Sequence, residues 1–306
     1  MRSLGIVLVF AVLATGFTAC TLGGPSGGYA FVDARIEPLS DRSGLILIRG
    51  TGDDSTPVAT YTSIITLENR MLGAADDVRI EVSNVNPGIM DFSHLNEQRV
   101  SLAPFEDPDG ADWFALIESN VPIYEPKNEY STQLRYHMCA RSRTFYQGTV
   151  CMAPPLGRHE YTPTCNPEIK RIEGGQQAPV AVTSIRQADA IDTVSVFIDV
   201  VNFGPGLVFD YSDSCARIPQ EAAGHIEITA LEIGGERILD SCQTSARMGF
   251  THEYQKHTGT TFTCVIDKNA LGIPDWDSTI TTDLSIELSY GYHVVAGTQP
   301  IIIRKI

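Results

Sequence analysis

Acidic residues cluster in one turn-forming stretch at a spacing that would suit a bound cation. Asp107, Asp109 and Asp112 follow one another closely, and Ca²⁺ prefers several carboxylate oxygens within a short loop. The spacing differs from that of an EF-hand, so a solvated acidic turn is the competing interpretation and the one that we favour.

Other residues whose side chains could bind a ligand or catalyse a reaction are scattered along the sequence. Asp275 and Asp277 flank Trp276, a group that would stack on a sugar ring or simply anchor a loop by its aromatic side chain. His252 and His257 lie close in sequence, and a polar loop explains them as well as a metal site does. The sequence contains no HExxH or phosphate-loop motif, and its one Gly-x-Ser-x-Gly match, residues 24–28, lies in a glycine-rich stretch and not at a nucleophile elbow between a strand and a helix. We therefore predict no catalytic residue, metal or cofactor, and a protein that is not an enzyme.

Cysteines predict disulfide bonds, because an even set of six follows Cys20 in a chain that we expect to leave the reducing cytosol. A predicted hairpin places Cys139 opposite Cys151, and two later predicted strands carry Cys242 and Cys264. A zinc cluster is the alternative, but no CxxC or HxxxH spacing supports it. The predicted pairs are Cys139–Cys151, Cys242–Cys264 and, by elimination, Cys165–Cys215.

The first 28 residues predict export and membrane attachment. Arg2 precedes an apolar run from Leu4 to Phe17 that is too short for a membrane span and is typical of a signal peptide. The end of this run, Phe17-Thr18-Ala19-Cys20, resembles the lipobox of prokaryotic lipoproteins, which implies cleavage after residue 19 and a diacylated or dialkylated glycerol on Cys20. An ordinary secretory signal and an uncleaved anchor are the alternatives. Residues 21–28, rich in glycine, predict a flexible tether.

Charge and length limit the function further. The formal net charge of −15 over 306 residues argues against nucleic acid and against electrostatic adhesion to anionic lipid. The length after cleavage suggests two domains of usual size, which is about 100–150 residues. We expect the protein on the extracellular face of the membrane, held by its lipid anchor.

Nearly every ordered segment alternates apolar and polar residues with the two-residue period of strands. The sequence therefore predicts an all-β protein of two tandem antiparallel β-sandwiches, residues 29–165 and 179–306, joined by a linker at 166–178. Residues 193–201 illustrate the pattern, because Val194, Val196, Ile198 and Val200 share a core face whereas Phe197 on the other face needs cover. The predicted strands are 29–36, 45–49, 60–67, 78–82, 100–103, 115–119, 130–139, 147–152, 180–186, 193–201, 207–209, 225–233, 237–243, 260–267, 284–294 and 299–304, with helical turns at 91–98 and 269–272.

A weak internal repeat links the two halves. In each, a strand ends in an asparagine, Asn69 or Asn202, and a glycine-bearing turn leads to the next strand. This pattern resembles the immunoglobulin-like modules of prokaryotic cell-surface proteins of CARDB and NEW3 type. Together with the lipobox, residues 150–154 and residues 174–182, it also resembles surface lipoproteins of small archaea. The resemblance implies a structural fold and brings no catalytic residue.

The favoured function is a non-enzymatic interaction, adhesion or envelope-structure module at the cell surface, with a surface protein or glycan as partner. Exposed aromatic side chains would make the contact, and we name Trp113, Phe197 and Trp276 as candidates. A small-ligand or carbohydrate-binding subunit is the second interpretation, and a hydrolase with a site built from loops is the third.

Overall fold

The computed structural model describes residues 31–38, 44–48, 57–105, 114–124, 126, 129–153, 165, 169–172, 176–190, 192–212, 223–251, 256–271 and 279–306. These residues form strands with three short helices, so the all-β prediction is confirmed. The strands up to residue 152 are β1 Val32–Pro38, β2 Leu45–Ile48, β3 Ala59–Asn69, β4 Ala75–Ser83, β5 Val100–Leu102, β6 Phe114–Ile123 and β7 Tyr130–Met152. Those that follow are β8 Ile169–Arg171, β9 Val180–Asp189, β10 Thr193–Asn202, β11 Leu207–Phe209, β12 His225–Ile233, β13 Glu236–Arg237, β14 Ser245–Arg247, β15 Phe250–Thr251, β16 Lys256–His257, β17 Gly259–Asp267 and β18 Ile280–Lys305. The helices are α1 Ser93–Asn96, η2 Leu239–Ser241 and η3 Lys268–Leu271.

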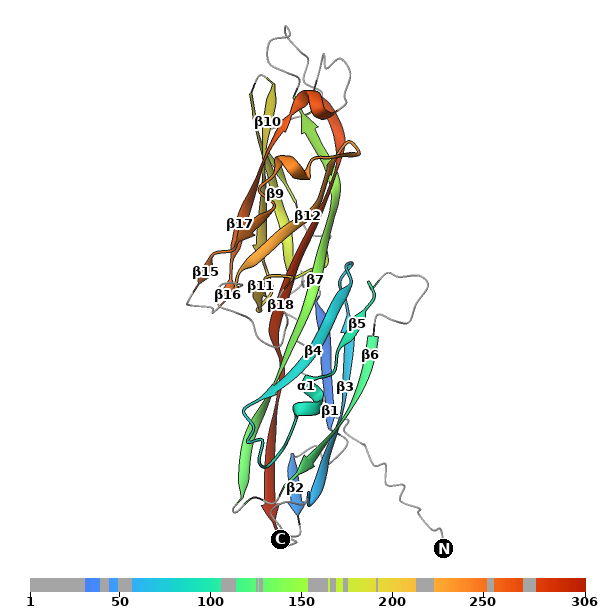
Figure 1. Cartoon of the computed structure of the whole chain (residues 1–306), viewed down its shortest axis with the longest axis vertical. Coiled ribbons are helices and arrows are strands. Elements are labelled where there is room, and N and C mark those ends of the chain that lie inside the picture. Colours follow the sequence, from blue (N-terminus) through green and yellow to red (C-terminus); the bar gives the residue numbers. More distant parts are fainter. Residues whose placement is uncertain are drawn as a thin grey trace, which may run out of the picture.

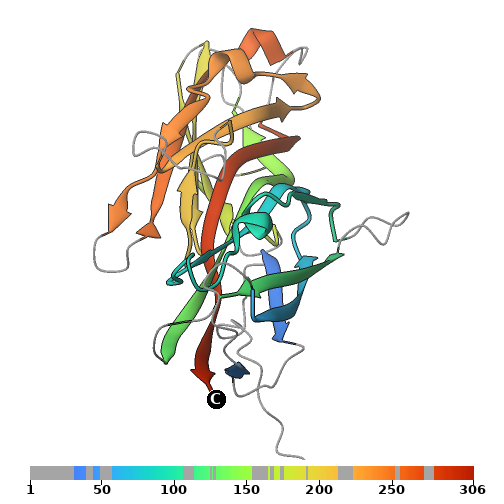
Figure 2. The same ribbon diagram turned by 60° about the horizontal axis from the view of Figure 1, so that its bottom comes forward.

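Two unusually long strands, β7 and β18, run side by side along the long axis of the molecule (Figures 1 and 2). They pair in antiparallel register from Ile280 opposite Met152 to Ile303 opposite Tyr130, with one irregularity between Val295 and Gly297. A typical strand has five or six residues, whereas β7 has 23 and would extend about 75 Å at the usual rise per residue. This ladder joins two lobes at opposite ends of the molecule.

Lobe 1 contains β1 to β6 with the first half of β7 and the second half of β18. Its small sheet has the order β1-β3-β6, and the other sheet continues from β18 through β7 and β4 to β5. β2 adds to the end of β18 in parallel register. Between the sheets lies a core that includes Ile65, Leu67, Tyr136 and Ile301, all fully buried.

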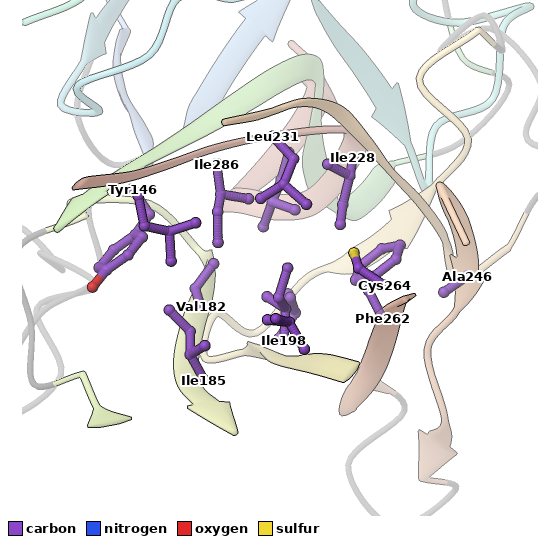
Figure 3. Packing of buried hydrophobic residues seen from close by; sticks show 14 of the residues in the cluster. Tyr146, Val182, Ile185, Ile198, Ile228, Leu231, Ala246, Phe262, Cys264 and Ile286 are labelled. Atoms are coloured by element: carbon purple, nitrogen blue, oxygen red, sulfur yellow. The ribbon is translucent and has the colours of Figure 1, made fainter. Parts of the chain in front are cut away.

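Lobe 2 contains β8 to β17 with the remaining halves of β7 and β18. The sheet β17-β10-β9-β8 faces the sheet formed by β13, β12, β18 and β7. The predicted core face of β10 is confirmed, because Val194, Val196, Ile198 and Val200 are all buried. Figure 3 shows Ile286, Leu231 and Ile228 pointing from one sheet toward Val182, Ile198 and Phe262 of the other.

The predicted internal repeat is confirmed in the geometry of its two turns. The side chain of Asn69 donates to the Gly73 carbonyl and accepts from the Met71 N–H. Asn202 makes the same pair of bonds, donating to Gly206 and accepting from Gly204. The topology repeats as well, since β3 lies between β1 and β6 as β10 lies between β9 and β17, and the turns lead to β4 on β7 and to β11 on β18. The two lobes therefore share the connectivity of these strands, although β12 pairs with β18 directly whereas β5 pairs with β4.

One of the three disulfide predictions is confirmed. Cys242–Cys264 is present, but Cys151 is bonded to Cys165, so the predicted pairs Cys139–Cys151 and Cys165–Cys215 are wrong. The reason is that residues 130–152 form one continuous strand instead of a hairpin, which keeps Cys139 and Cys151 far apart. Cys139 is disulfide-bonded as well, whereas Cys20 and Cys215 lie outside the described residues.

Several element boundaries also differ from prediction. The strands predicted at 284–294 and 299–304 are one strand, β18, and residues 237–243 contain the helix η2 instead of a full strand. Each core takes residues from both predicted domains, because Tyr146 packs in lobe 2 and Ile303 packs in lobe 1. The predicted linker lies partly outside the described residues, so the proposed domain division stays a prediction.

Candidate functional site

β6 is an edge strand with apolar side chains on its solvent face. It ends the sheet order of lobe 1, and along residues 115–121 no described strand pairs with its outer side. Leu116 is 64% exposed and Phe114 is 41% exposed. The far end of the strand is covered, because Ile123 bridges to Met90. An edge with exposed apolar residues and no lysine is a template for pairing with another chain.

The equivalent edge strand of lobe 2, β17, is closed. The Cys242–Cys264 disulfide attaches the neighbouring segment to it, and the Gln243 N–H donates to the Thr263 carbonyl. Farther along, the Gly249 N–H donates to the Gly259 carbonyl. Segment 242–249 thus occupies the outer side of β17 that β6 leaves open, so the two lobes differ at this position.

Of the three predicted contact residues, the structure describes one. Phe197 lies half-buried on β10 with the Arg186 guanidinium 5.3 Å from its ring centre, which provides the cover that the sequence required. Trp113 and Trp276 lie outside the described residues. Leu116, by contrast, was not a candidate, because a single leucine in an alternating strand gives no sign in the sequence of which sheet edge it will occupy.

Around Phe197 the polar groups form a closed network. Arg186 makes two hydrogen bonds to Asp199, which also accepts from Ser184 and Thr261. The bonds from Arg186 contribute most to lowering the pKa of Asp199, to about 2. All these groups are partnered within the lobe, so this face provides structural support.

A second polar cluster covers the outer face of the long sheet where the lobes meet. A bulge in β4 places Asp77 at φ 51°, and its carboxylate binds the buried Arg79 at two positions. Arg141 and the exposed Arg99 also approach Asp77, at 3.3 Å and 3.7 Å. The bulge thus aims one carboxylate at three guanidinium groups.

Tyr211, which follows β11, reaches across to lobe 1. Its hydroxyl donates to Asp76 at 3.1 Å and accepts from Arg143 at 3.4 Å. The guanidinium groups of Arg141 and Arg143 lie 5.8 Å and 5.6 Å from its ring centre. The hydrogen bond to Tyr211 raises the pKa of Arg143. This contact ties the two lobes together on the outer face.

Beside this cluster, Ser83 Oγ lies 2.7 Å from His137 Nε2. A serine bound to a neutral histidine resembles part of a nucleophile–base pair, which needs a third group to orient the imidazole. The His137 Nδ1 atom is buried and has no hydrogen-bond partner among the described residues. The orienting group is therefore missing from this part of the chain.

The other predicted chemical sites cannot be placed. Asp107, Asp109, Asp112, Asp275 and Asp277 lie outside the described residues, as do His252 and the side chain of His257. Among the residues that the structure does describe, no three His, Cys, Asp or Glu side chains converge in a way that would hold a metal ion. Within the same part of the chain, no helix has the length and apolar character to cross a membrane.

One signal in the sequence could have revealed the polar junction. Arg135, His137, Cys139, Arg141 and Arg143 alternate with apolar or small residues without interruption, which is the pattern of one long strand with a polar outer face.

Comparison with models of protein families, with curated proteins and with solved structures finds no match for this chain.

Proposed function

We propose that this protein is a lipid-anchored module of a prokaryotic, archaeal-type cell surface that binds a partner protein through the open edge of β6. In this proposal the two lobes are tandem immunoglobulin-like sandwiches, and Cys20 carries the lipid. The observation that carries the proposal is the 64% exposure of Leu116 on an edge strand. The closed state of the equivalent strand β17 supports it.

The chemistry of strand addition defines the expected partner. Backbone hydrogen bonds to β6 give affinity, and alternate side chains give specificity. Leu116 and the exposed Glu118 lie on one face of β6, so the partner strand would carry an apolar residue opposite Leu116 and a basic residue opposite Glu118. The continuous β7–β18 ladder would hold this edge in a fixed orientation.

A photo-crosslinking residue at position 116 tests the interaction in intact cells. We expect a discrete crosslinked protein whose attached peptide is an extended segment, and we expect Leu116→Lys to abolish binding of that protein. Position 265 is the matched control, because Val265 is 53% exposed on the equivalent strand β17. Equal crosslinking at both positions, or none at 116, would contradict the proposal.

The anchor has a separate test. Cys20→Ser should move the protein from the membrane fraction to the soluble fraction, because stable attachment requires the lipid chains. Retention of this variant in membranes after a high-salt wash would rule out lipid anchoring at Cys20 and leave the binding role of β6 untouched.

A further inference from the structure

Two histidines stack across the β7–β18 ladder near the middle of the molecule. His137 lies on β7 and His293 on β18, with ring centres 5.3 Å apart and planes 14° from parallel. The ladder changes register just beyond them, between Val295 and Gly297. The pair therefore lies beside the irregular point of the strands that join the lobes.

The groups that face this pair come from β7 itself and from the neighbouring strands β4 and β11. On β4, Ser83 bonds to His137 and Glu81 lies opposite it in register. On β7, Arg135 and Arg141 share the outer face with His137. On β11, Leu207 lies opposite His293.

Neither ring forms an ion pair with a carboxylate of the described residues, in contrast to His225, which lies 4.0 Å from Asp210. A positive charge on either ring would thus be poorly compensated there.

The electrostatic environment favours neutral rings. Burial lowers the pKa of His137, and the charge of Arg135 lowers it further. Burial likewise lowers the pKa of His293, with a contribution from His137. The pKa of Glu81, which lies opposite His137 in register, is raised by burial, so acidification also reduces the negative charge of this carboxyl group.

We propose that His137 and His293 form an acid-sensitive latch, in which protonation of both rings opens the β7–β18 pairing beside the register change and lets the lobes move relative to each other. Each ring takes one proton from solvent, and no covalent bond changes. Two like charges on adjacent strands repel, and the repulsion is strongest where water is partly excluded. The latch is closed at neutral pH.

The sign of the pH dependence follows from linkage. A histidine whose pKa is lower in the folded state than its usual value of about 6.5 loses folding stability as pH falls from about 6.5 through the folded pKa. Each unit by which the pKa of a histidine is lowered in the folded state multiplies the opening equilibrium constant at low pH by about ten. Opening should therefore increase between pH 7 and pH 5.

Hydrogen exchange of the whole chain at pH 7.5 and pH 5.0, corrected for intrinsic rates, tests the latch. We expect backbone amides of residues 136–139 and 292–297 to lose protection by about tenfold or more at pH 5.0. The double variant His137→Gln/His293→Gln should abolish this loss, whereas the control His225→Gln should keep it. Equal protection of the wild type at both pH values, or an undiminished loss in the double variant, would overturn the proposal.

If the double variant does not fold, the wild-type imidazole signals decide the question by NMR. Titration midpoints below about 6.5 for both rings support the latch, and midpoints at or above that value contradict it.

Discussion

β6 in lobe 1 and β17 in lobe 2 hold the same place beside the central strands β3 and β10, yet their outer sides differ. A disulfide and backbone hydrogen bonds from segment 242–249 close β17. Among the described residues no strand pairs with the outer side of β6 along residues 115–121, where Leu116 is exposed. Within the part of the chain that the structure describes, the same three-strand arrangement thus has a covered outer edge in lobe 2 and an uncovered one in lobe 1.

The difference shows at which sheet edge the backbone groups lack a partner strand among the described residues. Unpaired N–H and C=O groups at an edge favour association with another strand, and natural proteins usually blunt such edges. Lobe 2 follows this rule and lobe 1 departs from it.

The largest expected effect tests whether the lobes share their stability. Ile65 and Ile198 each lie four residues before the repeated asparagine, and both are fully buried. Ile65→Ala and Ile198→Ala should each reduce the free energy of unfolding by about 2–5 kcal/mol. Because β7 and β18 pass through both cores, urea denaturation should show one transition that both variants shift. Two transitions, each moved by only one variant, would show that the lobes unfold independently.

The disulfide that closes β17 gives the next largest effect. Replacing Cys242 and Cys264 by alanine together should cost about 3 kcal/mol, since the bond joins residues 22 apart in sequence. Hydrogen exchange should then accelerate along β17, while protection in β6 stays the same. An unchanged hydrogen-exchange rate along β17 would mean that the hydrogen bonds of segment 242–249 suffice to close this edge.

The repeated asparagine turns should respond alike. Asn69→Ala and Asn202→Ala each remove the side-chain donor of a glycine carbonyl and the side-chain acceptor of a backbone N–H, so each should lower the free energy of unfolding by about 1–3 kcal/mol. The effect of Asn202→Ala should be the smaller of the two, because the Gly204 N–H also donates to the Pro179 carbonyl. The control Asn120→Ala, at an exposed position of β6, should change it by less than about 0.5 kcal/mol. A large difference between the two turns in thermal or chemical denaturation would argue against their equivalence.

The smallest effect on stability belongs to the open edge itself. Leu116→Lys and Val265→Lys replace exposed side chains and should each change the free energy of unfolding by less than about 0.5 kcal/mol. Light scattering should separate them, because a lysine on an open edge suppresses strand pairing. We expect Leu116→Lys alone to reduce concentration-dependent self-association, and an equal reduction by Val265→Lys would mean that both edges are accessible.

Local pattern predicted much of the fold and little of the site. The alternation in residues 193–201 identified the core face correctly. The hairpin predicted around residues 140–146 was wrong, because polar residues there suggested a turn although they lie on the outer face of one strand. Tyr211 carried no signal, since its partners Asp76 and Arg143 are distant in sequence.

The sequence by itself determined the all-β class and the paired asparagine turns, because strand periodicity and turn chemistry act between near neighbours. Only the tertiary structure decided that β7 and β18 run through both lobes, that Cys151 meets Cys165, and that His137 stacks on His293. It also decided which edge stays open. Strand order and register depend on which distant segments share a core, and no local pattern encodes that choice.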